Sequence, residues 1–121
     1  MPHTNSFKSA FPRDFKRATR EIDTLQSADD ITKKEARYLK AMLQYVNVQH
    51  FEKTGQALAW PDFEQLRGVE PSIDNWAPRE LGKVKTSLVD KKLLRVHRDE
   101  IHTGAAISQS ASVYHVLLQA L

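Results

Sequence analysis

The chain lacks the residues on which several kinds of site depend. Its 121 residues include no cysteine, which excludes disulfide bonds, thiolate metal ligands and cysteine nucleophiles. The four glycines leave few places for a loop that cradles phosphates, and the sequence contains no nucleophile elbow and no paired acidic motif. The five histidines have no HxxxH or HExxH spacing. We therefore expect a protein that is not an enzyme and that binds no metal and no cofactor.

Long apolar runs are also missing. No stretch approaches the roughly 20 apolar residues that cross a bilayer, and the N-terminal residues lack the apolar segment of a signal peptide. With 40% hydrophobic residues the chain can bury one ordinary core, and too few remain for a second. We expect a cytoplasmic protein with one domain over residues 11–121. Residues 1–10 carry no periodic signal and are expected to form a flexible N-terminus.

Positive charge is concentrated in one part of the chain. Residues 76–98 contain two acidic residues and seven basic ones, which are Arg79, Lys83, Lys85, Lys91, Lys92, Arg95 and Arg98. This segment carries +5, and because the whole chain carries +3, the remainder sums to 3 − 5 = −2. A local positive field is typical of a phosphate-binding surface, although a solvated, lysine-rich helix face has the same pattern.

Two helices are predicted in the N-terminal half. Apolar residues at spacings of three and four predict a helix over residues 12–27. Thr32 and Glu35 then have the spacing of a capping box. The apolar period that follows predicts the longest helix of the chain, over residues 33–53, which would end at Gly55.

The C-terminal half alternates short helices with strand-like segments. Residues 56–60 are apolar and are followed by Pro61, which favours a brief edge strand. Phe63 and Leu66 are expected to point inward from the helix that follows. The remaining segments are a helix over 62–69, a turn-rich connector over 70–75, a helix beginning near Pro78, and two strands over 93–98 and 111–117 joined by a loop over 103–110.

The order of these elements is informative. Two segments carry a resemblance: AWPDFEQL at residues 59–66 is similar to a short strand that leads into a helix-turn-helix, and LVDKKLLR at residues 88–95 is similar to a recognition helix that enters a wing. Over residues 33–117 the chain thus resembles the winged helix-turn-helix superfamily of DNA-binding proteins. It departs from that pattern at Leu93, where glycine is common, and in its long connector. The resemblance implies a mainly α fold with a small β-hairpin (α+β), extended by an N-terminal helix.

The resemblance also implies that the helix beginning near Pro78 enters the major groove of DNA. If its core-facing residues are Ala77, Leu81, Val84 and Leu88, then the opposite face carries Arg79, Lys83, Thr86 and Asp90. Arg79 and Lys83 suit guanine edges or phosphates, and Thr86 and Ser87 suit either. Phosphate contacts are predicted for Lys85, Lys91, Lys92, Arg95 and Arg98. In the loop, contacts to the minor groove or the DNA backbone are predicted for His102, Gln109 and Ser110.

The sequence therefore predicts a sequence-specific, double-stranded DNA-binding protein: a transcriptional regulator, or a replication or maintenance factor of a plasmid or phage. The alternative is a winged-helix protein-interaction module in a larger assembly, which binds an acidic partner or RNA. An apolar stripe within residues 11–28 predicts a homodimer, unless it packs on the chain's own core; its members are Phe11, Phe15, Ile22 and Leu25. Trp60, Trp76 and Tyr114 are expected to pack in the core or at its rim. No small-molecule ligand is expected.

Overall fold

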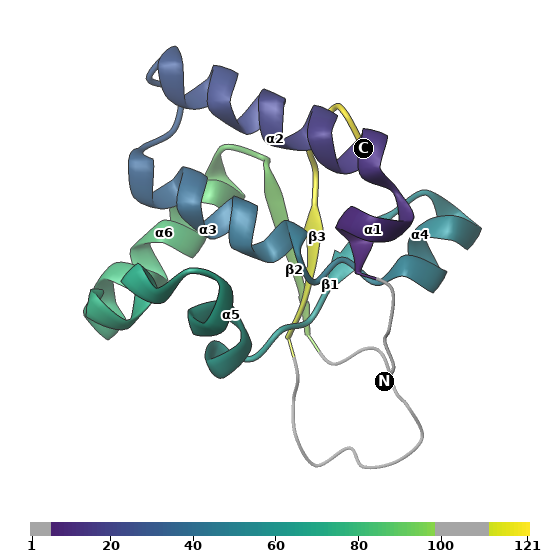
Figure 1. Ribbon diagram of the computed structural model, residues 1–121. Coiled ribbons are helices and arrows are strands. Elements are labelled where there is room, and N and C mark those ends of the chain that lie inside the picture. The colour runs from purple at the N-terminus through teal and green to yellow at the C-terminus, as the bar shows by residue number, and fades with distance from the viewer. Residues whose placement is uncertain (1–5, 99–111) are drawn as a thin grey trace.

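A computed structural model of the chain describes residues 6–98 and 112–121 (Figure 1). The fold is mainly helical with one small antiparallel sheet, as the sequence predicts. In chain order, its elements are α1 (Phe7–Ala10), α2 (Pro12–Ser27), α3 (Lys33–Leu43), α4 (Val48–Thr54), β1 (Ala57–Ala59), α5 (Phe63–Val69), the 3-10 helix η1 (Pro71–Asn75), α6 (Pro78–Asp90), β2 (Leu94–Arg98) and β3 (Ser112–Val116). Among the described helices, none is long and apolar enough to cross a membrane.

The three strands form one sheet in the order β1-β3-β2. The last strand is central, because Tyr114 pairs with Ala59 of β1 and with Val96 of β2. The edge strand predicted near residues 56–60 is therefore confirmed. Since β1 precedes α5 and α6 in sequence but pairs with the last strand, the sheet ties both helices into one unit.

One core lies between α3, α6, the sheet and the N-terminal helices. Tyr38, Leu39 and Met42 of α3 are fully buried, and Leu88 of α6 meets the same cluster. Figure 1 shows α2 on one side of α3, with α5 and α6 on the other. Because α3 packs against both α2 and α6, it is the central helix of the fold.

The α2 helix begins and ends where the sequence predicts. Its apolar stripe packs on the chain's own core: Ile22 is fully buried, and Phe11, Phe15 and Leu25 are partly buried against the core cluster. The sequence left this packing on the chain's own core open as the alternative to a homodimer interface. The homodimer stays a prediction that this stripe does not support.

Regular structure begins closer to the N-terminus than the sequence predicts. Residues 7–10 form α1, and the Ser6 hydroxyl caps it by accepting a hydrogen bond from the Ser9 amide at 3.1 Å. Phe7 is fully buried, and its ring lies 5.0 Å from that of Phe51 in an edge-to-face arrangement. The prediction of a flexible segment over 1–10 is thus wrong for residues 7–10. A four-residue helix is too short to leave a periodic signal.

The single long helix predicted over 33–53 is also wrong, because the chain breaks it into α3 and α4. Between them, Val46 forms a β-bridge with Ala59, and the Asn47 amide donates to the Leu58 carbonyl at 2.8 Å. The Asn47 side chain then caps α4 by accepting from the His50 amide at 2.8 Å. Pairing with β1 outcompetes continuation of the helix.

The α6 helix ends with a left-handed residue, although glycine is absent there. Lys92 has φ 63°, its amide donates to the Val89 carbonyl, and the Leu93 amide donates to the Leu88 carbonyl, both at 3.0 Å. This pair of bonds is a Schellman motif. The chain therefore turns out of α6 into β2 with a lysine in the left-handed position, one residue before Leu93.

Candidate nucleic-acid interface

The α6 helix has a core-facing side and an open side. Val84 and Leu88 are buried and Leu81 is half-buried, so the predicted core face is correct for these three residues. Ala77 is exposed because it precedes the first turn in an extended conformation. The opposite side carries Arg79, Lys83, Thr86 and Asp90, all exposed. We call Arg79, Lys83 and Thr86 the open face of α6.

Consecutive residues of α3 hold α6 near both of its ends. Lys34 pairs with Glu80 in the first turn of α6, and its ammonium also lies 5.8 Å from the centre of the Trp76 ring. Glu35 accepts a hydrogen bond from the Lys91 ammonium at 2.7 Å just beyond the last turn. These contacts fix the orientation of α6 on α3 and leave its open face free of the core.

Glu35 is the buried polar residue of this contact. Burial raises the pKa of its carboxyl, but hydrogen bonds from Lys91, Ser87 and Thr32, together with the Lys91 charge, outweigh burial and lower the pKa below 4.5. Glu35 also completes the capping box that the sequence predicts, since it accepts from the Thr32 amide at 2.9 Å. The carboxylate therefore starts α3 and anchors the end of α6 at once.

Lys85 points away from the open face. Its ammonium donates to the Tyr114 hydroxyl at 3.2 Å and lies 5.6 Å from the centre of that ring. A cavity of about 320 Å³ adjoins this contact, lined by residues from β3, α3, α6 and the start of α5. Trp60 and Phe63 form part of its wall and are about half exposed, so the expectation that Phe63 points inward is wrong. Trp76 and Tyr114 are buried, as expected.

The other predicted site residues fall into three groups. Ser87 and Lys91 face Glu35 of α3. Lys92 and Arg95 are exposed, beside the exit of α6 and on β2. The side chain of Arg98, and the loop residues His102, Gln109 and Ser110, lie outside the described part of the structure. The structure thus brings Arg79, Lys83 and Thr86 together on one exposed face, whereas Lys85, Ser87 and Lys91 have partners within the molecule.

Gly82 lies beside the open face, between Arg79 and Lys83. No atom lies within 4 Å of the place where a Cβ would stand, so core packing does not require glycine here. Glycine inside a helix costs about 1 kcal/mol relative to alanine.

Replacing Gly82 by alanine is expected to raise the free energy of unfolding by about 1 kcal/mol. Gly68 of α5 is a matched control, because it too has open space at its Cβ position. Gly68→Ala should give a similar gain, reduced because it lies near the end of α5. Urea unfolding measures both gains, and a Gly82→Ala variant no more stable than the wild type would contradict the prediction.

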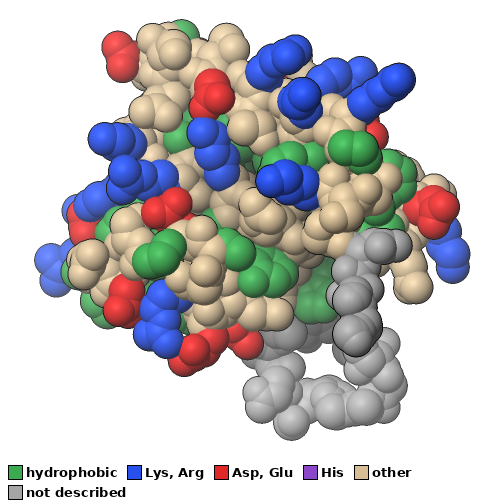
Figure 2. Space-filling view, in the orientation of Figure 1, with side chains coloured by type: hydrophobic (Ala, Val, Ile, Leu, Met, Phe, Trp, Pro, Cys, Tyr) green, Lys and Arg blue, Asp and Glu red, His purple; other side chains and the backbone are tan. Residues whose placement is uncertain are grey.

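A second basic surface lies on the N-terminal helices, which the sequence analysis did not single out. Residues 6–20 contain five basic residues and one acidic residue, for a balance of 5 − 1 = +4. Figure 2 shows blue side chains gathered over α2. We call its exposed cations the α2 basic face: Lys8, Arg13, Lys16, Arg17 and Arg20. The net charge of residues 6–20 alone reveals this surface. The sum over all residues outside 76–98 conceals it, because acidic residues elsewhere cancel its charge.

Two histidines lie close together on the sheet. His97 and His115 lie diagonally across β2 and β3, with ring centres 6.4 Å apart. Burial, the Arg95 charge and the charges of His97 and His50 lower the pKa of His115. Among the described residues, no group of three or more potential ligands could hold a metal ion.

No protein-family model, no curated protein and no solved structure matches this chain.

Proposed function

We propose that this protein is a winged-helix DNA-binding protein that places the open face of α6 in the major groove of duplex DNA. The observation that carries the proposal is the open face itself: Arg79, Lys83 and Thr86 are exposed, while the other side of the helix is buried. A major groove about 12 Å wide admits an α-helix. The α5, η1 and α6 segment between β1 and β2 supports the winged-helix assignment, as does the strand order β1-β3-β2.

The proposed contacts follow from where each side chain lies. Arg79 and Lys83 reach guanine edges or phosphates, and Thr86 reaches bases or phosphates. Exposed Lys92 and Arg95 flank the helix and contact phosphate. Lys85, Ser87 and Lys91 are left out of the proposed interface because each has a partner inside the molecule.

The biological role proposed with this chemistry is control of transcription, or of plasmid or phage replication or maintenance, in the cytoplasm. A non-catalytic role and a homodimer on two half-sites are further predictions of the proposal. The competing function is a protein-interaction module, for which α6 would meet an acidic protein or RNA instead of DNA.

Titration of a duplex against salt tests the proposal. With about four phosphate contacts, the slope of log K against log salt is expected near −3.6, so affinity should fall roughly 150-fold between about 50 and 200 mM salt. Fluorescence anisotropy with a labelled duplex measures this. Weak binding at every salt concentration would favour the protein-interaction module over DNA binding.

A further inference from the structure

One side of α2 is apolar and buried, and the opposite side carries cations. Its apolar side packs inward on Ala18 and Ile22, both fully buried. Relative to Arg13, a helical turn of about 100° per residue places Lys16 near −60°, Arg20 near −20° and Arg17 near +40°. By the same count Ile22 lies near 180°. The cations therefore occupy one arc of about 100°, directly opposite the buried side.

The carboxylates of α2 are occupied within the molecule. Glu21 accepts hydrogen bonds from the amides of Gln119 and Ala120, at 3.0 and 2.8 Å. Asp23 accepts from the Lys40 ammonium at 2.6 Å, and Asp14 lies 3.7 Å from the Arg17 guanidinium. The Glu21 and Asp23 contacts hold α2 to the C-terminal segment and to α3. By the same count of about 100° per residue, these two carboxylates lie near +80° and −80°, outside the arc of cations.

The cations themselves are mostly free. Across residues 6–98 and 112–121, neither Arg13, Lys16 nor Arg20 forms an ion pair with a described residue. Even Arg17, which faces Asp14, keeps 63% of its side chain exposed. The α2 basic face therefore carries more unpaired positive charge than the open face of α6, which has Arg79 and Lys83.

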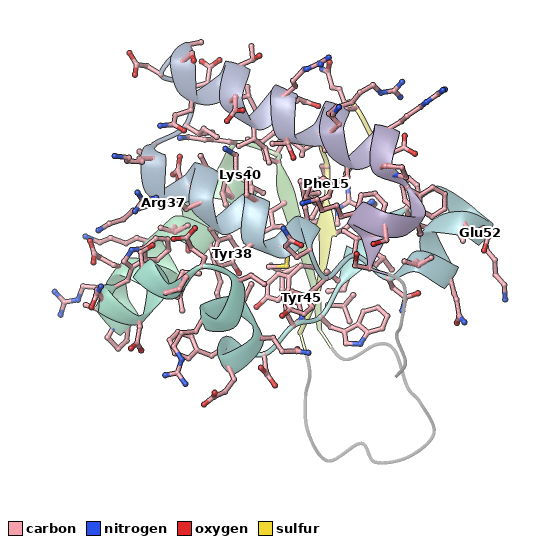
Figure 3. The ribbon with its side chains drawn as sticks, viewed as in Figure 1. Phe15, Arg37, Tyr38, Lys40, Tyr45 and Glu52 are labelled. Carbon is pink, nitrogen blue, oxygen red and sulfur yellow. The ribbon has the colours of Figure 1, made fainter. Side chains whose placement is uncertain are left out.

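The two basic surfaces point in different directions. The α2 helix packs on one side of α3, and α6 packs on the other (Figure 1). In Figure 3, Lys40 and Arg37 mark α3 between them, and Phe15 marks the inward side of α2. Because both basic surfaces face away from the shared core, a rigid duplex in contact with α6 leaves the α2 basic face uncovered.

We propose that the α2 basic face binds a second segment of nucleic acid, so that one molecule holds two duplex segments. From Arg13 to Arg20 the helix advances about 10 Å, over which a duplex presents about six phosphate charges. Charge complementarity selects this occupant, and because contacts between cations and phosphates carry no sequence information, the proposed binding is independent of sequence. The inference rests on the proposed function for its choice of nucleic acid as the polyanion.

A bridging assay tests this proposal. Duplex fixed on beads is loaded with the 121-residue chain, and capture of a second, fluorescent duplex is measured. The wild type should capture the second duplex. The double variant Arg13→Gln with Arg20→Gln should lose most of this capture, because about two phosphate contacts are lost on the second surface. Since the open face of α6 is unchanged, the affinity of this double variant for a single selected duplex should stay within about twofold of the wild type. Arg13→Lys with Arg20→Lys should retain capture, because the charge is kept.

Matched controls separate this proposal from the proposed function. Lys33→Gln with Lys53→Gln removes two exposed cations elsewhere and should leave capture unchanged. The double variant Arg79→Ala with Lys83→Ala should lose selective binding yet retain salt-sensitive, unselective binding through α2. If this double variant binds the selected duplex as the wild type does, the α6 proposal fails while the α2 result still stands.

Three outcomes would contradict the proposal that the α2 basic face binds a second duplex. The first is capture by the α2 glutamine variant equal to the wild type, as when a dimer bridges through two copies of α6. The second is an equal loss of single-duplex affinity and capture, which would place both faces on one duplex. The third is binding of this face to anionic phospholipid vesicles with no contribution to DNA capture. Unchanged thermal melting of each variant establishes that the fold is intact.

Discussion

Replacing Glu35 by alanine is expected to destabilise the protein by about 3 kcal/mol at neutral pH, because it breaks a buried ion pair and a capping box together. The Glu35 side chain is 5% exposed and accepts from Lys91 at 2.7 Å and from the Thr32 amide at 2.9 Å. Lys91 is 36% exposed and can regain water once its partner is gone, which keeps the loss at the lower end of the usual 3–5 kcal/mol range. Urea unfolding of the variant measures it.

Two further variants divide the loss between its causes. Glu35→Gln keeps an oxygen that can accept from the Thr32 amide but removes the charge, so its cost should be about half that of the alanine variant. Lys91→Met leaves the buried carboxylate without its counter-ion and should cost about 3 kcal/mol, with the salt dependence of DNA binding unchanged. A flatter salt dependence of DNA binding by Lys91→Met would indicate that Lys91 contacts DNA.

Stability should also depend on pH through Glu35. Because its pKa in the folded state lies below the ordinary 4.5, its contribution is fully present above pH 4.5 and is lost as the pH falls through the lowered folded-state pKa. The stability difference between the wild type and Glu35→Gln should therefore shrink toward low pH. A difference that stays constant over that range would show that the carboxylate charge is not what stabilises this contact.

Replacing Arg79 or Lys83 by alanine is expected to weaken binding to a selected duplex by about 1–3 kcal/mol each if the side chain reads a base. Both side chains are exposed, so the free energy of unfolding should change by less than about 0.5 kcal/mol. The duplex is first selected from a random pool at a stated salt concentration, and the dissociation constants are then compared on selected and random sequences.

The pattern of loss assigns each residue its role. A loss confined to the selected duplex identifies a base contact, whereas an equal loss on all sequences, with a smaller salt slope, identifies a phosphate contact. Lys53→Ala, an exposed lysine on α4, is the matched control and should bind as the wild type does. Unchanged binding in both the Arg79 and Lys83 variants would contradict the proposed major-groove helix.

Local signals in the sequence were sufficient for most of the elements. The period of α2, the capping box of Thr32 and Glu35, and the start of α6 at Pro78 all depend on residues within one or two turns of each other. The open face of α6 followed from the same helical period, because a buried side fixes the opposite side. These features needed no knowledge of the rest of the chain.

Contacts between distant residues decided what the pattern could not. The break between α3 and α4 depends on the pairing of Val46 with Ala59, and the order at Phe7 depends on Phe51. Lys91 and Lys85 look like phosphate ligands in the sequence, but they bind Glu35 and Tyr114, which are 56 and 29 residues away. The sequence by itself determined the helices and strands whose signals are local, such as α2, β1 and α6. Only the tertiary structure decided which cations remain open to a partner, because a charge is free or paired according to neighbours that the chain brings together by folding.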